Sequence, residues 1–147
     1  MTSLDLSEFD PQSLAVRCAE TMLAADAAAA ALGIRLVSAD EGQAELAMTV
    51  TRQMLNAHRI GHGGVVFTLA DTAFAVACNS YNRVTVAAAC TIEFLAPAAE
   101  GDELTATAVE RYRRGRSGLY DVTVRRPDGT QIAELRGRGR EVGGSLV

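Results

Sequence analysis

The sequence predicts one α+β domain in which an antiparallel sheet wraps around a single buried helix. The first observation is the run VVFTLADTAFAVACN at residues 65–79, which is apolar on nearly every side and therefore typical of a helix buried all round. The second is a series of strand-like runs separated by turn residues. The third is the length of 147 residues, which suits one domain, without an internal repeat, linker or low-complexity segment. A first helix, two strands, the buried helix and then a series of strands follow one another along the chain, and this order indicates an α+β architecture.

The chain is expected to begin with a long helix. Asp10 has the residue type of an N-cap, and Pro11 suits the first helical position. The alanine-rich run at residues 12–32 continues the helix, and Gly33 ends it.

Six strands are expected, two before the buried helix and four after it. Their ranges are residues 34–38, 43–50, 85–95, 103–113, 119–126 and 131–141. The turn residues Asp40-Glu41-Gly42 join the first two, and Pro127-Asp128-Gly129 joins the last two as a hairpin. Residues 51–64 are predicted to be irregular. The strands after the helix are expected to follow one another as an antiparallel meander.

Composition excludes several classes of function. All 14 basic residues are arginines, so Schiff-base lysines, lysine-anchored pyridoxal phosphate and the Walker A loop are excluded. A net charge of −4 argues against general binding of nucleic acid or of anionic membranes. Cys18, Cys78 and Cys90 lie in apolar runs without a CxxC pair, which indicates buried, reduced thiols. With no signal-peptide pattern and no apolar run of the ~18 residues that a membrane span needs, we expect a cytoplasmic protein.

Asp71 is the most informative residue, because it lies in the middle of the apolar helix. An unpaired carboxylate in apolar surroundings costs several kcal/mol, so this side chain is expected to be paired, protonated or functional. A structural role as an ion-pair partner and a role in catalysis remain open on composition alone.

The segment His62-Gly63-Gly64 precedes that helix. Glycines let a ligand approach the backbone, and the first N–H groups of a helix lack internal partners. Together with the helix dipole they suit a developing oxyanion, although two glycines also suit a tight loop. Asn56 lies ahead of this segment and can both donate and accept hydrogen bonds, as a catalytic residue or as a turn former.

His58 and His62, with Asp71 as a third ligand, also suggest a metal site. The glycines nearby argue against the helix that such a spacing needs, and no cysteine is close in sequence. We therefore predict no metal.

These segments together resemble the signature of the hotdog-fold acyl-CoA thioesterases, and more narrowly of their PaaI branch, the thioesterases of phenylacetic acid degradation. The segments are Leu55-Asn56-Ala57-His58, His62-Gly63-Gly64, Phe67, Leu69-Ala70-Asp71-Thr72-Ala73-Phe74, Ala77-Cys78-Asn79-Ser80, Cys90-Thr91-Ile92-Glu93-Phe94-Leu95, Gly101-Asp102 and Gly143-Gly144. The resemblance runs from about Met48 to Gly144. It implies a sheet around one central helix, dimers joined edge to edge and association of dimers into tetramers.

The resemblance also implies catalytic residues. Asp71 matches the family's acid, Gly63 its helix-start glycine, Asn56 its loop asparagine and His62 the histidine of its HGG motif. The family takes the acid from one subunit and the asparagine and glycine from the other, which implies an active site at the dimer interface. Some relatives hold the attacking water with a serine on the next strand, but the matching stretch, residues 86–89, is Val-Ala-Ala-Ala.

The implied activity is hydrolysis of an acyl-CoA thioester, with an arylacetyl group such as phenylacetyl or hydroxyphenylacetyl favoured, and without a cofactor. Leu55, Phe67 and Phe74 suit an apolar acyl pocket, and Gly64 suits close approach of the substrate. Four arginines suit either contact with the phosphates of CoA or a solvated turn, and the sequence favours neither: Arg111, Arg113, Arg114 and Arg116.

Two other functions stay open. One is a non-catalytic acyl-CoA-binding regulator, which normally carries a DNA-binding segment and lacks the acid. The other is a hotdog hydratase or dehydratase, which uses a histidine with an acid. We divide the chain into an N-terminal helical extension, residues 1–33, and a hotdog thioesterase domain, residues 34–144.

Overall fold

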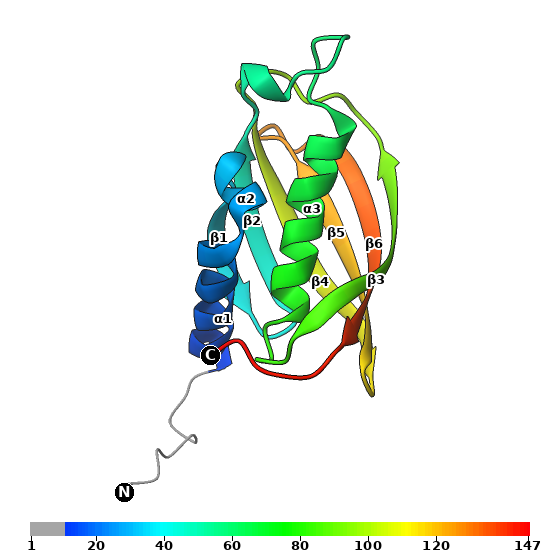
Figure 1. The fold of residues 1–147 in the computed structure, drawn as a ribbon. Coiled ribbons are helices and arrows are strands. Elements are labelled where there is room, and N and C mark those ends of the chain that lie inside the picture. The colour runs from blue at the N-terminus through cyan, green and yellow to red at the C-terminus, as the bar shows by residue number, and fades with distance from the viewer. Residues whose placement is uncertain (1–10) are drawn as a thin grey trace, which may run out of the picture.

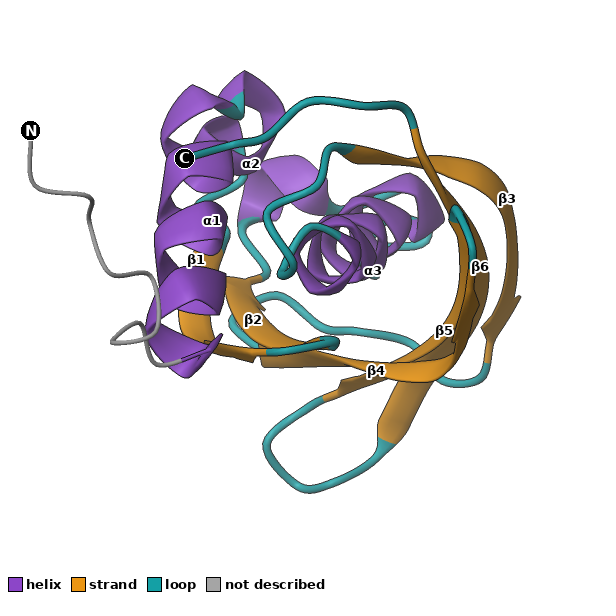
Figure 2. Cartoon of the chain, turned by 90° about the horizontal axis from the view of Figure 1, so that it is seen from below, coloured by secondary structure: helices purple, strands orange, loops and turns teal. Residues whose placement is uncertain are grey.

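A six-stranded antiparallel sheet curls around helix α3 in the computed structural model, which describes residues 11–147 (Figures 1 and 2). The elements are α1 (Pro11–Ala25), α2 (Ala27–Ala31), β1 (Arg35–Asp40), β2 (Gln43–Thr49), a 3-10 helix (Arg52–Met54), α3 (Gly63–Cys78), β3 (Thr85–Phe94), β4 (Glu103–Arg114), β5 (Ser117–Arg125) and β6 (Gln131–Glu141). The predicted α+β class and the sheet around one central helix are confirmed.

The N-terminal helix is broken, where the sequence predicted a single helix over residues 12–32. Asp26 has extended backbone angles, φ −91° and ψ 95°, and its Oδ1 accepts a hydrogen bond from the N–H of Ala29 at 2.9 Å. A short polar side chain that caps a new helix competes with continuation of the first one. The expected N-cap, Asp10, lies outside the described residues. Helices α1 and α2 lie along one side of α3, next to β1 (Figure 2).

The strand order is β1-β2-β4-β5-β6-β3, with every neighbouring pair antiparallel. The expected meander is correct for β4, β5 and β6, but β3 does not lie beside β4. It pairs with β6 and forms the far edge of the sheet. The residue after β3 continues this pairing at the start of β6, where the N–H of Leu95 donates to the carbonyl oxygen of Ile132 at 2.8 Å. The curled sheet brings this last strand round to the other side of α3 (Figure 2).

Helix α3 packs against the concave face of the sheet. The Phe74 ring makes an edge-on contact with Tyr120 at 5.6 Å between centroids. A Cβ atom at Gly137 would lie 2.8 Å from the Phe74 ring, so glycine on β6 permits this close approach. The prediction that this helix is buried on all sides is wrong, because the sheet covers only part of it. Gly64 and Asp71 lie on a stripe that stays accessible.

All three cysteines are free. Cys18 and Cys78 are buried as predicted, whereas Cys90 is half-buried because its strand lies at the sheet edge. Within residues 11–147, no helix combines the length and the apolar character that crossing a membrane requires.

Candidate active site

The loop that leads into α3 is fixed by backbone hydrogen bonds. The N–H of Gly61 donates to the carbonyl oxygen of Ala98 at 2.7 Å, which ties the loop to the segment between β3 and β4. The N–H of Asn56 donates to the carbonyl oxygen of Ile60 at 2.9 Å and closes a tight turn. Asn56 is thereby held next to the N-terminal end of α3.

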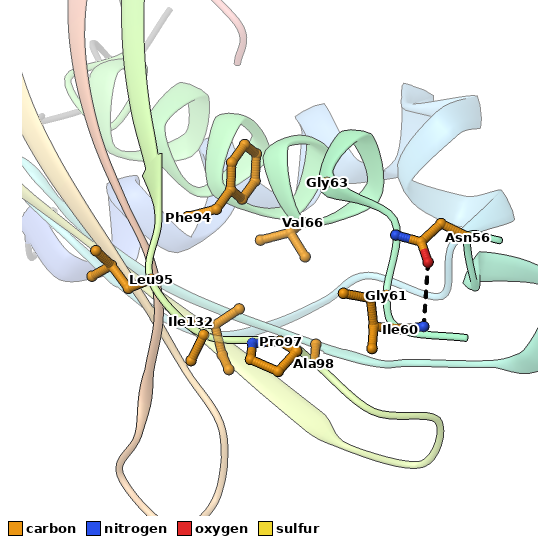
Figure 3. A pocket seen from close by; sticks show the side chains of 11 residues that line it. Asn56, Ile60, Gly61, Gly63, Val66, Phe94, Leu95, Pro97, Ala98 and Ile132 are labelled. Carbon is orange, nitrogen blue, oxygen red and sulfur yellow. Dashed lines mark hydrogen bonds between the residues drawn. The ribbon is translucent and has the colours of Figure 1, made fainter. Parts of the chain in front are cut away.

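The two ends of the Asn56 carboxamide have different surroundings. Its Oδ1 accepts hydrogen bonds from the N–H groups of His58 at 2.9 Å and Ile60 at 3.4 Å. In Figure 3 the amide nitrogen points the other way, toward the segment that leads into Gly63. The turn therefore uses the acceptor of Asn56 and leaves its amide donor directed at the N-terminal end of α3.

The first turn of α3 leaves one backbone donor free. His62 is the N-cap, and its Nδ1 accepts from the N–H of Gly64 at 3.2 Å. The carbonyl oxygen of His62 accepts from Val65 at 2.9 Å and Val66 at 3.1 Å. The N–H of Gly63 has no hydrogen-bond partner among residues 11–147. Because the helix dipole adds partial positive charge here, this N–H suits an oxygen that gains negative charge.

A cleft of about 460 Å³ opens beside this donor (Figure 3). Polar groups enter it at one end, from Asn56 and Gly63, and apolar side chains form the rest. The lining residues are Asn56, Ile60, Gly61, Gly63, Val66, Phe94, Leu95, Ala96, Pro97, Ala98 and Ile132. A mostly apolar cleft with a few convergent polar groups is typical of a site for a small molecule.

Asp71 does not line this cleft. It lies eight residues after Gly63, a rise of about 12 Å along the helix axis. The carboxyl is half-buried and makes no hydrogen bond or ion pair with any described residue. Burial raises the pKa of the Asp71 carboxyl, and the charge of Asp26 raises it further. Asp71 is therefore no partner of an arginine within the described chain, and one chain alone does not bring it to Gly63.

Comparison with known proteins identifies the family of this fold and site. Residues 58–133 match the model of the thioesterase superfamily. The chain is 49% identical to the acyl-coenzyme A thioesterase PaaI of Escherichia coli (strain K12) over 129 residues, 88% of this chain and 92% of the relative. The chain belongs to the thioesterase superfamily.

Solved structures of members of this superfamily agree with the assignment. The structure of the E. coli PaaI protein from the phenylacetic acid degradation operon matches with a TM-score of 0.91 and 47% identity, over 92% of this chain and 99% of that one. A mutant of the phenylacetic acid degradation protein PaaI from Thermus thermophilus matches with a TM-score of 0.77 and 32% identity, over 80% of this chain and 100% of that one. The resemblance to the hotdog thioesterases and their PaaI branch is confirmed.

In this thioesterase, two of the four arginines expected to meet CoA are engaged with the protein itself. Arg111 Nε lies 2.9 Å from Asp121 Oδ2. The Arg113 guanidinium lies 3.6 Å from the ring centroid of Tyr81 and also approaches Glu141, at 3.6 Å.

Arg114 and Arg116 are exposed at the turn between β4 and β5. This turn lies beside Cys78, at the C-terminal end of α3 (Figure 1), whereas the cleft lies at its N-terminal end. Within one chain, the four arginines therefore do not share a site with Gly63.

The residues predicted to form the apolar acyl pocket do not line the cleft. Phe74 is 1% exposed and belongs to the core, so its position does not fit a contact with substrate. Leu55 and Phe67 are half-buried and pack against the core, and neither lines the cleft. Gly64 is exposed on the open stripe of α3.

Strand β3 has no hydroxyl where some relatives carry serine. Ala88 lies in an irregularity of the β3–β6 pairing between Ala87 and Ala89. Cys90 follows on the face that turns toward α3, and both burial and the nearby charge of Asp71 raise the pKa of its thiol. Within residues 11–147, no three histidine, cysteine, aspartate or glutamate side chains group as a metal site.

Sequence reasoning missed most of the cleft wall. Ile60 lies in the loop before α3, Val66 in α3 and Ile132 in β6, and no pattern in the sequence links them. Phe94 was quoted as part of the family signature but not as a site residue. The one sequence signal that pointed to it is a large aromatic residue near the end of a predicted apolar strand.

Proposed function

We propose that this protein hydrolyses the thioester bond of an acyl-coenzyme A to the free acid and CoA, at an active site shared by two subunits. The observation that carries the proposal is the free N–H of Gly63 at the polar end of an apolar cleft. A thioester carbonyl that accepts from this N–H gains negative charge as water attacks, and the N–H and the helix dipole stabilise it. Removal of one such donor typically costs ~2.7–4 kcal/mol in barrier height.

Asp71 of the partner subunit supplies the acid in this proposal. The separation of about 12 Å along α3 argues against Asp71 and Gly63 of one chain acting on the same carbonyl. The free edge of β3 supports a dimer, because an unpaired edge strand with exposed apolar side chains such as Val86, 49% exposed, favours pairing with another strand. We further propose that such dimers associate into tetramers, as the family resemblance implies.

The ionised Asp71 acts either as general base on water or as nucleophile through a mixed anhydride. In the first case it takes a proton from the water that attacks the carbonyl carbon, and the CoA thiolate leaves as the tetrahedral intermediate collapses. In the second case the carboxylate attacks, the thiolate leaves, and water then hydrolyses the anhydride. Asn56 donates from its amide nitrogen to orient the carbonyl or the water. The thiolate is a good leaving group, so no strong general acid is needed.

The cleft supports an apolar acyl group, and we propose an arylacetyl-CoA, phenylacetyl-CoA or hydroxyphenylacetyl-CoA, as the favoured substrate in the cytoplasm. The volume of about 460 Å³ suits a small ring, and the match to the PaaI protein from the phenylacetic acid degradation operon of E. coli favours an arylacetyl group. We propose no cofactor, since CoA is part of the substrate. Arg114 and Arg116 of a neighbouring subunit remain candidates for the CoA phosphates.

A hotdog hydratase is the second candidate, because it would use a histidine with an acid. The Nδ1 of His62 caps α3, and the side chain of His58 is exposed outside the cleft. Hydrolysis therefore has the stronger support. The presence of Asp71 argues in the same way against a non-catalytic regulator.

Release of free thiol from a panel of acyl-CoA thioesters tests the proposal. We expect turnover with phenylacetyl-CoA and a fall of at least ~10²-fold in kcat for Asp71→Asn, the lower end for general-base catalysis. An Asp71→Asn protein that turns over at the parent rate contradicts the mechanism. Absence of thiol release from every thioester contradicts the function.

A further inference from the structure

Phe94 is a large apolar side chain that the fold leaves uncovered. It is the last residue of β3 and is 55% exposed, although Cys90 and Ile92 on the same face of the strand are half-buried. The pairing of Phe94 with Ala133 of β6 places it on the side of the sheet that faces α3. Its ring therefore lies on the concave side without being part of the core.

The ring lies against the start of α3. A Cβ atom built on Gly63 would be 3.2 Å from Phe94 Cζ, 3.4 Å from Cε1 and 3.7 Å from Cε2. Figure 3 shows the ring standing beside the first turn of the helix, above Val66 and at the upper wall of the cleft. The ring therefore borders the residue that carries the free N–H, and both residues line the same cleft.

The other walls of the cleft are fixed by the fold. Val66 is 3% exposed, Ile132 1% and Ala98 1%, so these side chains are locked among their neighbours. Leu95 is 53% exposed, but it points away from Gly63 in Figure 3. Among the described lining residues, Phe94 is the large, accessible side chain in contact with the residue that carries the free donor.

We propose that Phe94 is a specificity-determining residue, which admits acyl groups with an unbranched carbon next to the thioester carbonyl and rejects those branched there. The inference rests on the proposed function, in which the carbonyl oxygen accepts from Gly63. The next carbon of the acyl group then lies beside the Phe94 ring. A methylene passes along the ring with a flat aryl group behind it, whereas a methyl branch on that carbon overlaps the ring.

Two thioesters that differ by one methyl group test this selection. Phenylacetyl-CoA carries a methylene next to the carbonyl, and 2-phenylpropanoyl-CoA carries a methyl branch there. We expect the parent to prefer phenylacetyl-CoA, since one methyl group in a tight apolar site is worth about 10–200-fold in kcat/KM. Phe94→Leu and Phe94→Ala should reduce this preference by about tenfold or more.

Val37→Ala is the matched control. Val37 is 52% exposed on β1, away from both the cleft and the β3 edge, so its removal should leave the preference unchanged. A preference in Phe94→Leu and Phe94→Ala equal to that of the parent overturns the inference while the proposed function stands. If the parent itself releases thiol from neither thioester, the proposed arylacetyl-CoA substrate fails instead, and with it the ground for this inference.

A second measurement keeps the inference testable even if one substitution harms folding. Gly63→Ala places a Cβ atom against the ring, so it should lower kcat/KM for phenylacetyl-CoA more in the parent than in the Phe94→Ala background. Equal effects in the two backgrounds show that ring and helix start do not act together, and they overturn the inference.

Discussion

Substitution of His62 tests whether this residue caps α3 or takes part in catalysis. The family resemblance placed it among the catalytic residues, but its Nδ1 accepts the N–H of Gly64 at 3.2 Å and its ring is exposed. His62→Ala removes this one hydrogen bond. The bonds from Val65 and Val66 go to the backbone oxygen of His62 and survive the substitution. His62→Asn keeps a side chain that ranks among the best N-caps.

The expected cost of His62→Ala follows from that geometry. A lost N-cap costs about 0.5–2 kcal/mol, and a long bond at an exposed position belongs near 0.5–1 kcal/mol. For a domain of this length that corresponds to a fall of roughly 1–4 °C in Tm. We expect the Tm of His62→Asn to return to that of the parent. The rate of thiol release in both variants should stay within about threefold of the parent rate, because a general acid–base catalyst would contribute ~10²-fold or more to the rate.

Thermal unfolding and thiol release from phenylacetyl-CoA, measured on the same preparations, check both expectations. His58→Ala is the control, since its side chain is exposed and lies on the same loop. A loss of ~10²-fold in both His62 variants at unchanged Tm refutes the reasoning and restores His62 to the chemistry.

Three further predictions concern charge and metal. Burial raises the pKa of Asp71, so the folded protein favours the protonated carboxyl. The folded state is therefore most stable below the ordinary Asp pKa of about 3.9, and it loses this stability as pH rises through the raised pKa of Asp71. Asp71→Asn should therefore raise Tm at neutral pH, and the gain should vanish in acid; an equal Tm difference at all pH values contradicts this. Asp26→Asn keeps a good N-cap but removes the charge that raises the pKa of Asp71, so the acid limb of kcat/KM should move to lower pH. Glu20→Gln, on α1, should leave that limb in place, and a profile of Asp26→Asn that superimposes on the parent's rules out the coupling. EDTA should leave turnover unchanged, whereas loss of turnover that zinc restores would revive a metal site at the histidines.

The sequence predicted the elements whose signals are local. The apolar run at 65–79 and the alternating strand runs correspond to α3 and to the strands with small shifts at their ends. The position of β3 beside β6 could not be read from the sequence, because strand order depends on how the curled sheet closes around α3. The break at Asp26 was also missed, since one capping side chain outweighed the helix propensity of the alanines around it.

Within the candidate site, the sequence predicted the residues carried by compact motifs. Gly63 and Asn56 lie at the cleft, as the segments around them indicated. Phe74 was misplaced, because an apolar residue on a central helix has the same sequence signal whether it faces the core or a ligand. The cleft wall of Ile60, Phe94 and Ile132 arises only when three distant segments meet.

Mixing Asp71→Asn with Asn56→Ala tests the shared site most directly. Asp71→Asn lacks the acid and Asn56→Ala lacks the amide donor beside Gly63, so we expect each variant alone to release thiol much more slowly than the parent. If the acid and the donors come from different subunits, a mixed dimer of these variants holds one fully impaired site and one intact site. Random reassociation then restores about a quarter of the parent's thiol release, since half of the dimers are mixed and each has one working site. A mixture that stays as inactive as its two components contradicts the shared active site.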